Sequence, residues 1–179
     1  MSAATLDFTT VFSLELGYVL RTLRRLGVRD ADVEDVGHDV FLAVYGAWGA
    51  LNPDRPIRPW LFGFAFRFAS NYRRKLKPVD ELDDDVALST DAPPADEALA
   101  REGDRRLVLA ALERIPIARR AVFVLFEIDG VPVVEIARVL DIPEGTAHSR
   151  LHKARAEFRE AVSRLDRKER DGKSERTAS

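Results

Sequence analysis

A single acidic stretch constrains the fold of this 179-residue chain more than any other feature of its sequence. Residues 78–104 carry ten acidic side chains, one basic side chain and three prolines. Like charges, prolines and few large apolar groups cannot bury enough surface to offset the conformational entropy lost on folding. The sequence therefore predicts two folded domains, residues 1–77 and 96–165, joined by a flexible acidic linker over residues 78–95.

Apolar residues in both domains recur at three- and four-residue spacing, and no stretch alternates between apolar and polar residues. This periodicity predicts an all-α fold: two small helical domains without a sheet. In the first domain we expect a helix that ends at Gly27, a second helix capped by Asp30, and a third that begins with Pro59 and runs toward Lys77. The proline-rich segment 51–58 is expected to be a loop.

The spacing in the second domain predicts four helices. They are expected over residues 96–115, 117–129 and 133–140, and from Pro143 to about Leu165. The polar tail, residues 166–179, is expected to be disordered.

Composition excludes several classes of function. The chain has no cysteine, which rules out disulfides, cysteine-ligated zinc, iron–sulfur clusters and thiol nucleophiles. His148 and His152 stand four residues apart, as metal ligands can, but no third ligand accompanies them, so no metal site is expected. We find no phosphate-cradling loop and no Ser/His/Asp arrangement, and we expect neither an enzyme nor a cofactor. No signal-peptide pattern is present and no apolar run approaches the roughly 20 residues that span a bilayer, which predicts a soluble cytoplasmic protein.

The formal net charge of −2 conceals an uneven distribution. Residues 1–77 carry a net charge of +3, residues 78–104 one of −9 and residues 105–179 one of +4. A nucleic-acid-binding protein that acts alone needs a strong basic footprint. These modest values therefore favour a protein that gains its DNA affinity from a large partner.

Residues 133–147 have the pattern of a helix-turn-helix. Ile136 is expected to face the core, Ala137 is small where two helices cross, and Ile142 fills the turn. Asp141 stands where the turn needs a left-handed residue, a conformation that Asp adopts at modest cost. The pattern also suits two packed helices with a solvated basic face. The first two turns of the second helix are rich in hydrogen-bond donors and carry few acids, which favours DNA binding.

A recognition helix presents donors to base edges and cations to phosphates. The second helix of the motif offers Thr146, His148, Ser149, Arg150, His152, Lys153 and Arg155 for these purposes.

The first domain contains two further stretches of interest. Residues 35–45 form an amphipathic helical pattern, and its exposed face carries polar residues that the core does not need. Residues 59–75 are rich in aromatic side chains and end in a basic run. Many of these aromatics belong to the core whatever the function. Aromatic rings interleaved with arginines also suit single-stranded DNA, because rings stack on unpaired bases and cations hold the backbone.

The order of these motifs resembles bacterial sigma factors. The run Asp-x-x-His-Asp-Val-Phe-Leu from Asp35, a proline-rich loop, Pro-Trp-Leu-Phe-Gly from Pro59 and a basic helix end are similar to region 2. Residues 111–151 look like region 4. Two regions joined by one linker, over about residues 7–165, resemble the extracytoplasmic-function class.

The resemblance implies roles for region 2. Its second helix would bind the clamp helices of the polymerase β′ subunit through Val36, His38, Asp39 and Leu42. The loop and the third helix would read and open the −10 promoter element, with one base flipped into a pocket. The residues implied in this step are Asn52, Arg55, Arg58, Trp60, Arg67, Asn71, Tyr72, Arg73 and Arg74.

The resemblance also implies that region 4 docks on the β flap and reads the −35 element in the major groove. His148, Ser149, His152 and Lys153 match base-reading positions, whereas Thr146, Arg150 and Arg155 are better placed for phosphates. The linker would thread toward the active-site and RNA-exit channel of the polymerase. Sigma factors of this class are commonly held by an anti-sigma factor, which is the third partner that the resemblance implies.

The chain departs from the family pattern at several positions. His38 replaces a frequent Gln, and His148 stands where Arg or Lys is common. Phe64-Ala65-Phe66-Arg67 replaces the frequent Ile-Ala-x-Asn. Promoter preferences therefore do not transfer from better-known members. The alternative function is a stand-alone helix-turn-helix regulator, which would need its own basic footprint and usually a dimer interface.

Overall fold

The computed structural model describes residues 7–76 and 98–177, and within them every regular element is helical. The first domain contains α1 (Phe8–Arg25), α2 (Val33–Gly46), the short 3-10 helix η1 (Trp48–Ala50) and α3 (Ile57–Leu76). The second contains α4 (Ala98–Glu113), α5 (Ile117–Phe123), the π-helical turn η2 (Val124–Ile128), α6 (Val133–Val139) and α7 (Glu144–Thr177). The predicted all-α class is confirmed, and the predicted linker lies outside the described residues. None of the described helices is both long and apolar enough to cross a membrane.

The end of α1 follows the predicted signal. Gly27 has a φ of 89°, a left-handed conformation that glycine adopts without steric cost. The amide of Val28 donates to the carbonyl of Leu23, and that of Gly27 donates to Arg24. These two bonds satisfy carbonyls that the helix end would otherwise leave unpaired. The predicted stop at Gly27 is therefore confirmed.

Two helix starts in the first domain differ from the predictions. The residue before α2 is Asp32 and not Asp30. Asp30 instead pairs with Arg24 at 2.6 Å, which fixes it outside the helix. The third helix begins at Ile57, so Pro59 is its third residue rather than its first. A proline is still tolerated there, because amides of the first turn have no helical acceptor.

The turn of the helix-turn-helix is confirmed. Asp141 has a φ of 52°, and within the described residues it is the one non-glycine residue with a positive φ. The amide of Ile142 reaches back to the carbonyl of Ala137 at 2.9 Å. This closes the end of α6 in the same way that Gly27 closes α1. Ile136 and Ala137 are buried, as predicted.

Two other parts of the second domain differ from the predictions. The helix expected over 117–129 widens after Phe123 into the π-helical turn η2. The last helix does not stop near Leu165 but continues to Thr177, into the predicted tail. The sequence after Leu165 is rich in Lys, Arg and Glu, which favour helix, and pairs such as Glu160–Arg164 at 2.6 Å support this exposed helix.

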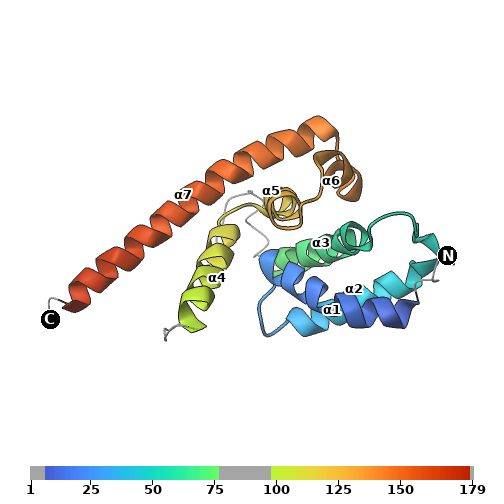
Figure 1. Cartoon of the computed structure of the whole chain (residues 1–179), viewed down its shortest axis with the longest axis horizontal. Helices are drawn as coiled ribbons and strands as arrows, with labels where there is room; N and C mark the ends of the chain where they lie inside the picture. The colour runs from blue at the N-terminus through green and yellow to red at the C-terminus, as the bar shows by residue number, and fades with distance from the viewer. Residues whose placement is uncertain (1–6, 77–97, 178–179) are drawn as a thin grey trace.

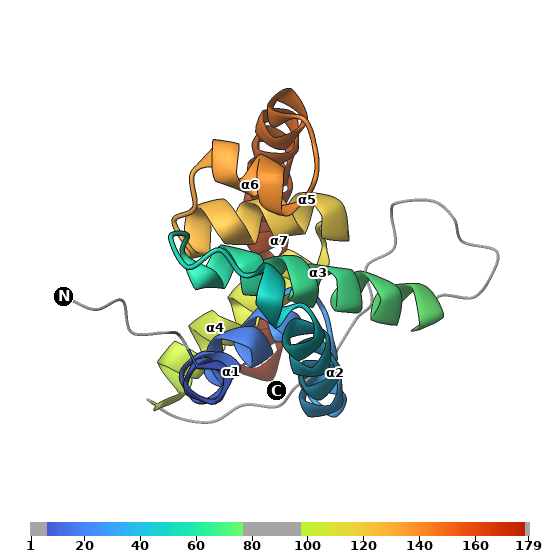
Figure 2. The same ribbon diagram turned by 90° about the vertical axis from the view of Figure 1, so that its right-hand side faces the viewer.

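The two domains pack against each other. The long helix α7 runs along α4, α5 and α6, while α3 separates α5 and α6 from α1 and α2 (Figures 1 and 2). Buried apolar side chains of both domains form one connected cluster that reaches from Val11 in α1 to Ala154 in α7. We call the contact between the domains the interdomain seam. It is formed by α1 and α3 on one side and by α4, α6 and Asp129, directly after η2, on the other.

Candidate nucleic-acid interface

The start of α7 borders a hollow of about 380 Å³. Thr146, Ser149, Arg150 and Lys153 line it from α7, and Arg119 lines it from α5. Four of these five side chains were singled out from the sequence, and the structure brings them together. Among the residues that the structure describes, no acidic side chain lines the hollow, so its chemistry is that of hydrogen-bond donors and positive charge. Such a surface suits the phosphates and base edges of a DNA duplex.

Sequence reasoning missed Arg119. It is 27 positions before Thr146 in the chain, and only the packing of α5 against α7 brings the two together. Glu157 pairs with its guanidinium at 2.7 Å and thereby fixes its orientation. The next residue, Arg120, is buried in the second domain and donates to the carbonyl of Ile115.

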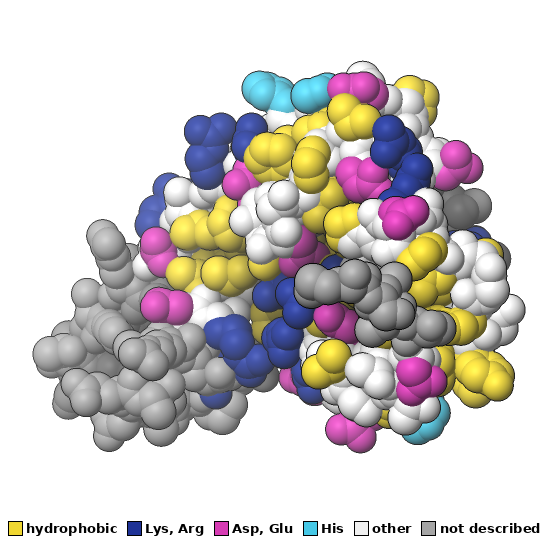
Figure 3. All heavy atoms as spheres, turned by 45° about the vertical axis from the view of Figure 1, so that its right-hand side comes forward, with side chains coloured by type: hydrophobic (Ala, Val, Ile, Leu, Met, Phe, Trp, Pro, Cys, Tyr) yellow, Lys and Arg dark blue, Asp and Glu magenta, His cyan; other side chains and the backbone are white. Residues whose placement is uncertain are grey.

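The two histidines of α7 lie on its exposed side. His148 and His152 are both exposed, and Glu144 lies 3.7 Å from the imidazole of His148. Figure 3 shows histidine and basic side chains at the end of the molecule that α6 and the start of α7 form. No group of three or more metal-ligating side chains occurs in the described part of the chain. Both histidines therefore lie at the surface of the helix that the sequence predicts to read DNA.

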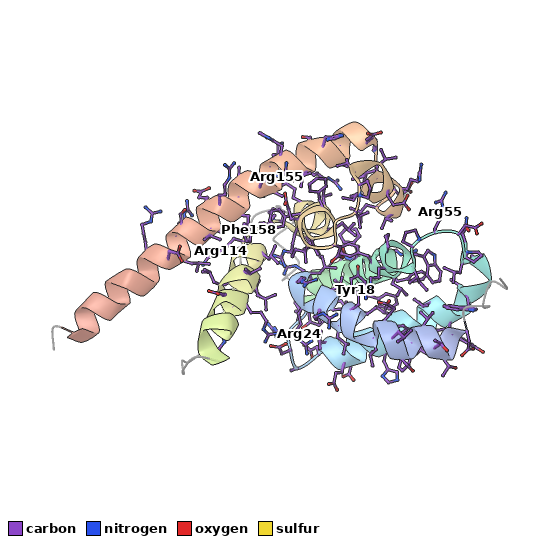
Figure 4. The ribbon with its side chains drawn as sticks, viewed as in Figure 1. Tyr18, Arg24, Arg55, Arg114, Arg155 and Phe158 are labelled. Atoms are coloured by element: carbon purple, nitrogen blue, oxygen red, sulfur yellow. The ribbon has the colours of Figure 1, made fainter. Side chains whose placement is uncertain are left out.

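Arg155, a predicted phosphate contact, is paired with an acidic side chain in this structure. Its guanidinium pairs with Glu127 at 2.6 Å and lies 5.0 Å from the centre of the Phe126 ring. Figure 4 shows it on α7, near Phe158. The side chain thus joins α7 to η2 and does not line the hollow.

The predicted −10 residues divide into an exposed group and a partly buried group. The exposed side chains are Asn52, Arg55, Arg58, Arg67, Asn71 and Arg74. Arg55 projects from the loop before α3 at the edge of the molecule (Figure 4). The side chain of Asn52 accepts from the amide of Asp54 at 2.9 Å and so shapes this loop. Arg67 lies 4.6 Å from the centre of the Phe64 ring.

The other three predicted −10 residues are partly buried. Trp60 packs edge-on against Trp48 and Phe64, with ring centres 6.3 and 5.0 Å away. The Tyr72 hydroxyl donates to Asp32, and burial followed by this bond raises the pKa of Tyr72. Arg73 is half-buried in the interdomain seam, and burial lowers the pKa of its guanidinium.

The predicted polymerase-binding helix presents an apolar face. His38, Asp39 and Leu42 are exposed on α2, and 66 % of Leu42 is accessible. Val36 instead packs against the core. Tyr45, which is 65 % exposed, follows Leu42 on the same face and was missed. The sequence contains the signal for it: Tyr45 stands seven residues after His38 and three after Leu42, and residues at i, i+4 and i+7 share a helix face.

Comparisons with known proteins match both domains of the chain. A family model described as Sigma-70 region 2 matches residues 11–79, and one described as Sigma-70, region 4 matches residues 105–158. The ECF RNA polymerase sigma-E factor of Escherichia coli is 30 % identical over 152 residues, which cover 79 % of both chains. The RNA polymerase sigma factor CnrH of Cupriavidus metallidurans is 28 % identical over 144 residues and 75 % of both chains.

Two solved structures have the same arrangement of helices. CnrH in complex with the cytosolic domain of CnrY matches with a TM-score of 0.62 and 26 % identity, over 87 % of both chains. The sigma factor RpoE in complex with the anti-sigma factor NepR from Bartonella quintana matches in fold, with a TM-score of 0.69 and 21 % identity, over 88 % of this chain and 97 % of that one. Regions 2 and 4 match in order along the chain, and the sigma-E factor is similar over most of its length. The chain therefore belongs to the extracytoplasmic-function family of bacterial RNA polymerase sigma factors.

Proposed function

We propose that this sigma factor divides promoter recognition between three of its surfaces. The exposed face of α2, with His38, Asp39, Leu42 and Tyr45, binds the β′ clamp helices of core polymerase. The start of α7 enters the major groove of the −35 element. The loop before α3 and the exposed side of α3 capture the melted −10 element. The β flap is the partner of the second domain.

The observation that carries this proposal is that three hydrogen-bond donors at the start of α7 have no partner among the described residues. The side chains of Ser149, Arg150 and Lys153 make no hydrogen bond or ion pair with any described residue. Donors that are already aligned and uncommitted need no internal bond broken before they meet DNA. Ser149 and Lys153, with His148 and His152, would read base edges, while Thr146 and Arg150 would hold phosphates.

The exposed side of α3 supports capture of single-stranded DNA. Arg67 and Asn71 stand four residues apart and therefore share a face, which Arg74 continues. Arg74 is fixed by a 2.7 Å bond to the side chain of Asn71. These cations and amides suit a strand backbone, while the buried rings hold the helix that presents them.

The test is transcription in vitro with core polymerase, with and without this protein, on a library of promoter sequences. We expect core to gain promoter-dependent initiation, and Lys153→Ala to weaken it at the −35 element. A stand-alone regulator would instead bind duplex DNA without core and would add no initiation. The proposal would be overturned if the protein neither bound core polymerase nor supported initiation.

A further inference from the structure

An acidic side chain of α1 meets α3 where the loop that would read the −10 element ends. Nε of Arg58, in the first turn of α3, donates a hydrogen bond to Oε2 of Glu15 at 2.8 Å. Only 14 % of the Glu15 side chain is exposed, against 58 % of the Arg58 side chain. The carboxylate is therefore held within the domain, whereas the arginine extends from it into solvent.

A second residue of α1 holds the same arginine. The guanidinium carbon of Arg58 lies 5.2 Å from the centre of the Tyr18 ring, a distance at which an aromatic ring attracts a cation. Glu15 and Tyr18 are three residues apart and therefore share a face of α1. We call these two side chains the Arg58 cradle. Both belong to the first domain, so the cradle does not depend on the position of the second domain.

The cradle leaves donors of the guanidinium uncommitted. Arg58 makes no hydrogen bond or ion pair with any described residue other than Glu15. A guanidinium has more N–H donors than one carboxylate can accept, even in a bidentate pair. The remaining donors are thus held in a fixed direction beside the −10 loop, where a DNA phosphate can accept from them.

We propose that Glu15 is a positioning residue for −10 recognition, which orients Arg58 toward a phosphate of the melted strand. This role rests on the proposed function, because it requires the start of α3 to meet −10 DNA. A carboxylate close to a phosphate is unfavourable by charge alone. Orientation and charge therefore predict effects of opposite sign: without Glu15, orientation predicts weaker DNA binding and charge predicts tighter binding.

The first measurement needs no DNA. Side-chain NMR of the full chain gives the order parameter of the Arg58 Nε–H bond, whose signal is assigned by its loss in Arg58→Lys. Glu15→Ala should lower this order parameter below about 0.6, a value typical of a flexible group. Glu15→Gln should lower it less, because an amide oxygen still accepts from Nε. An order parameter that Glu15→Ala leaves unchanged would overturn the positioning role.

Asp30→Ala is the matched control. It removes one acid and a 2.6 Å ion pair with Arg24 from the same domain. Because Asp30 lies outside the cradle, this variant should leave Arg58 ordered and should bind DNA like the native chain.

The second measurement titrates holoenzyme, assembled from core polymerase and each variant, with a labelled single strand that carries a −10 sequence selected from the promoter library. Glu15→Ala should weaken binding about three- to tenfold, because DNA must then order a rotamer-rich side chain. Glu15→Gln should weaken it less, and Arg58→Ala at least as much as Glu15→Ala. In the Arg58→Ala background, Glu15→Ala should cause no further loss.

The possible failures have different signatures. Equal or tighter binding by Glu15→Ala would overturn the proposal, and so would native-like binding by Arg58→Ala. A further loss in the double variant would overturn it too, because Glu15 would then act on the fold of the loop and not through Arg58. Failure of the proposed function would appear in the native holoenzyme itself, which would not capture the strand.

Discussion

The salt dependence of promoter binding provides a quantitative test of the hollow at the start of α7. Each phosphate that a cation neutralises adds about 0.9 to the slope of log affinity against log salt, because it releases a condensed counterion. Arg119, Arg150 and Lys153 line the hollow. Arg119 is already paired with Glu157 at 2.7 Å, so its contribution is reduced. Arg150 is the unpaired cation that we assign to a phosphate.

Arg150→Ala should therefore reduce the slope by about 0.9 for every promoter sequence. Between 50 and 200 mM salt this amounts to a change of about 3.5-fold in the relative affinity of variant and native protein. Lys153→Ala should also weaken discrimination at one base pair of the −35 element, by about 1–3 kcal/mol. Arg155→Ala should have less effect on the slope, because Arg155 is engaged by Glu127 at 2.6 Å.

The assay is a salt titration of holoenzyme, assembled from core polymerase and each variant, on labelled promoter duplexes that differ at single −35 positions. Thermal unfolding of each variant checks that the second domain is intact. Equal slope changes in Arg150→Ala and Arg155→Ala would refute the assignment of the two arginines to different partners. An unchanged slope in Arg150→Ala would refute the phosphate contact itself.

Three further perturbations test other parts of the molecule. Asp141→Val should lower the free energy of unfolding by about 1–2 kcal/mol, because a β-branched residue at a φ of 52° is strained; Asp141→Gly should not, and urea unfolding separates the two. Leu42→Ala should weaken binding to core polymerase roughly tenfold, through lost apolar burial, and leave binding of the −35 duplex unchanged, as a pull-down with core and a duplex titration would show. Replacing the carboxylates at 83–85 by amides should impair initiation or promoter escape more than DNA binding; transcript yields equal to those of the native chain would count against a role for the acidic linker.

Features fixed by local chemistry were predictable from the sequence. Gly27 and Asp141 end helices because the backbone there turns left-handed, and a glycine or a short polar residue marks such a position. The donors on α7 were likewise predictable, since Thr146, Ser149, Arg150 and Lys153 fall on successive turns. Their side chains share the hollow because a helix repeats every 3.6 residues.

Features that depend on packing were not predictable in this way. Asp30 and Asp32 have the same chemistry, and only the position of Arg24 assigns Asp30 to an ion pair. The ion pair of Arg155 with Glu127 was not predictable either, because nothing in the sequence places Glu127 beside it. The Tyr18 hydroxyl donates a hydrogen bond to the carboxylate of Asp129, 111 positions away, across a segment whose length does not fix the orientation of the two domains.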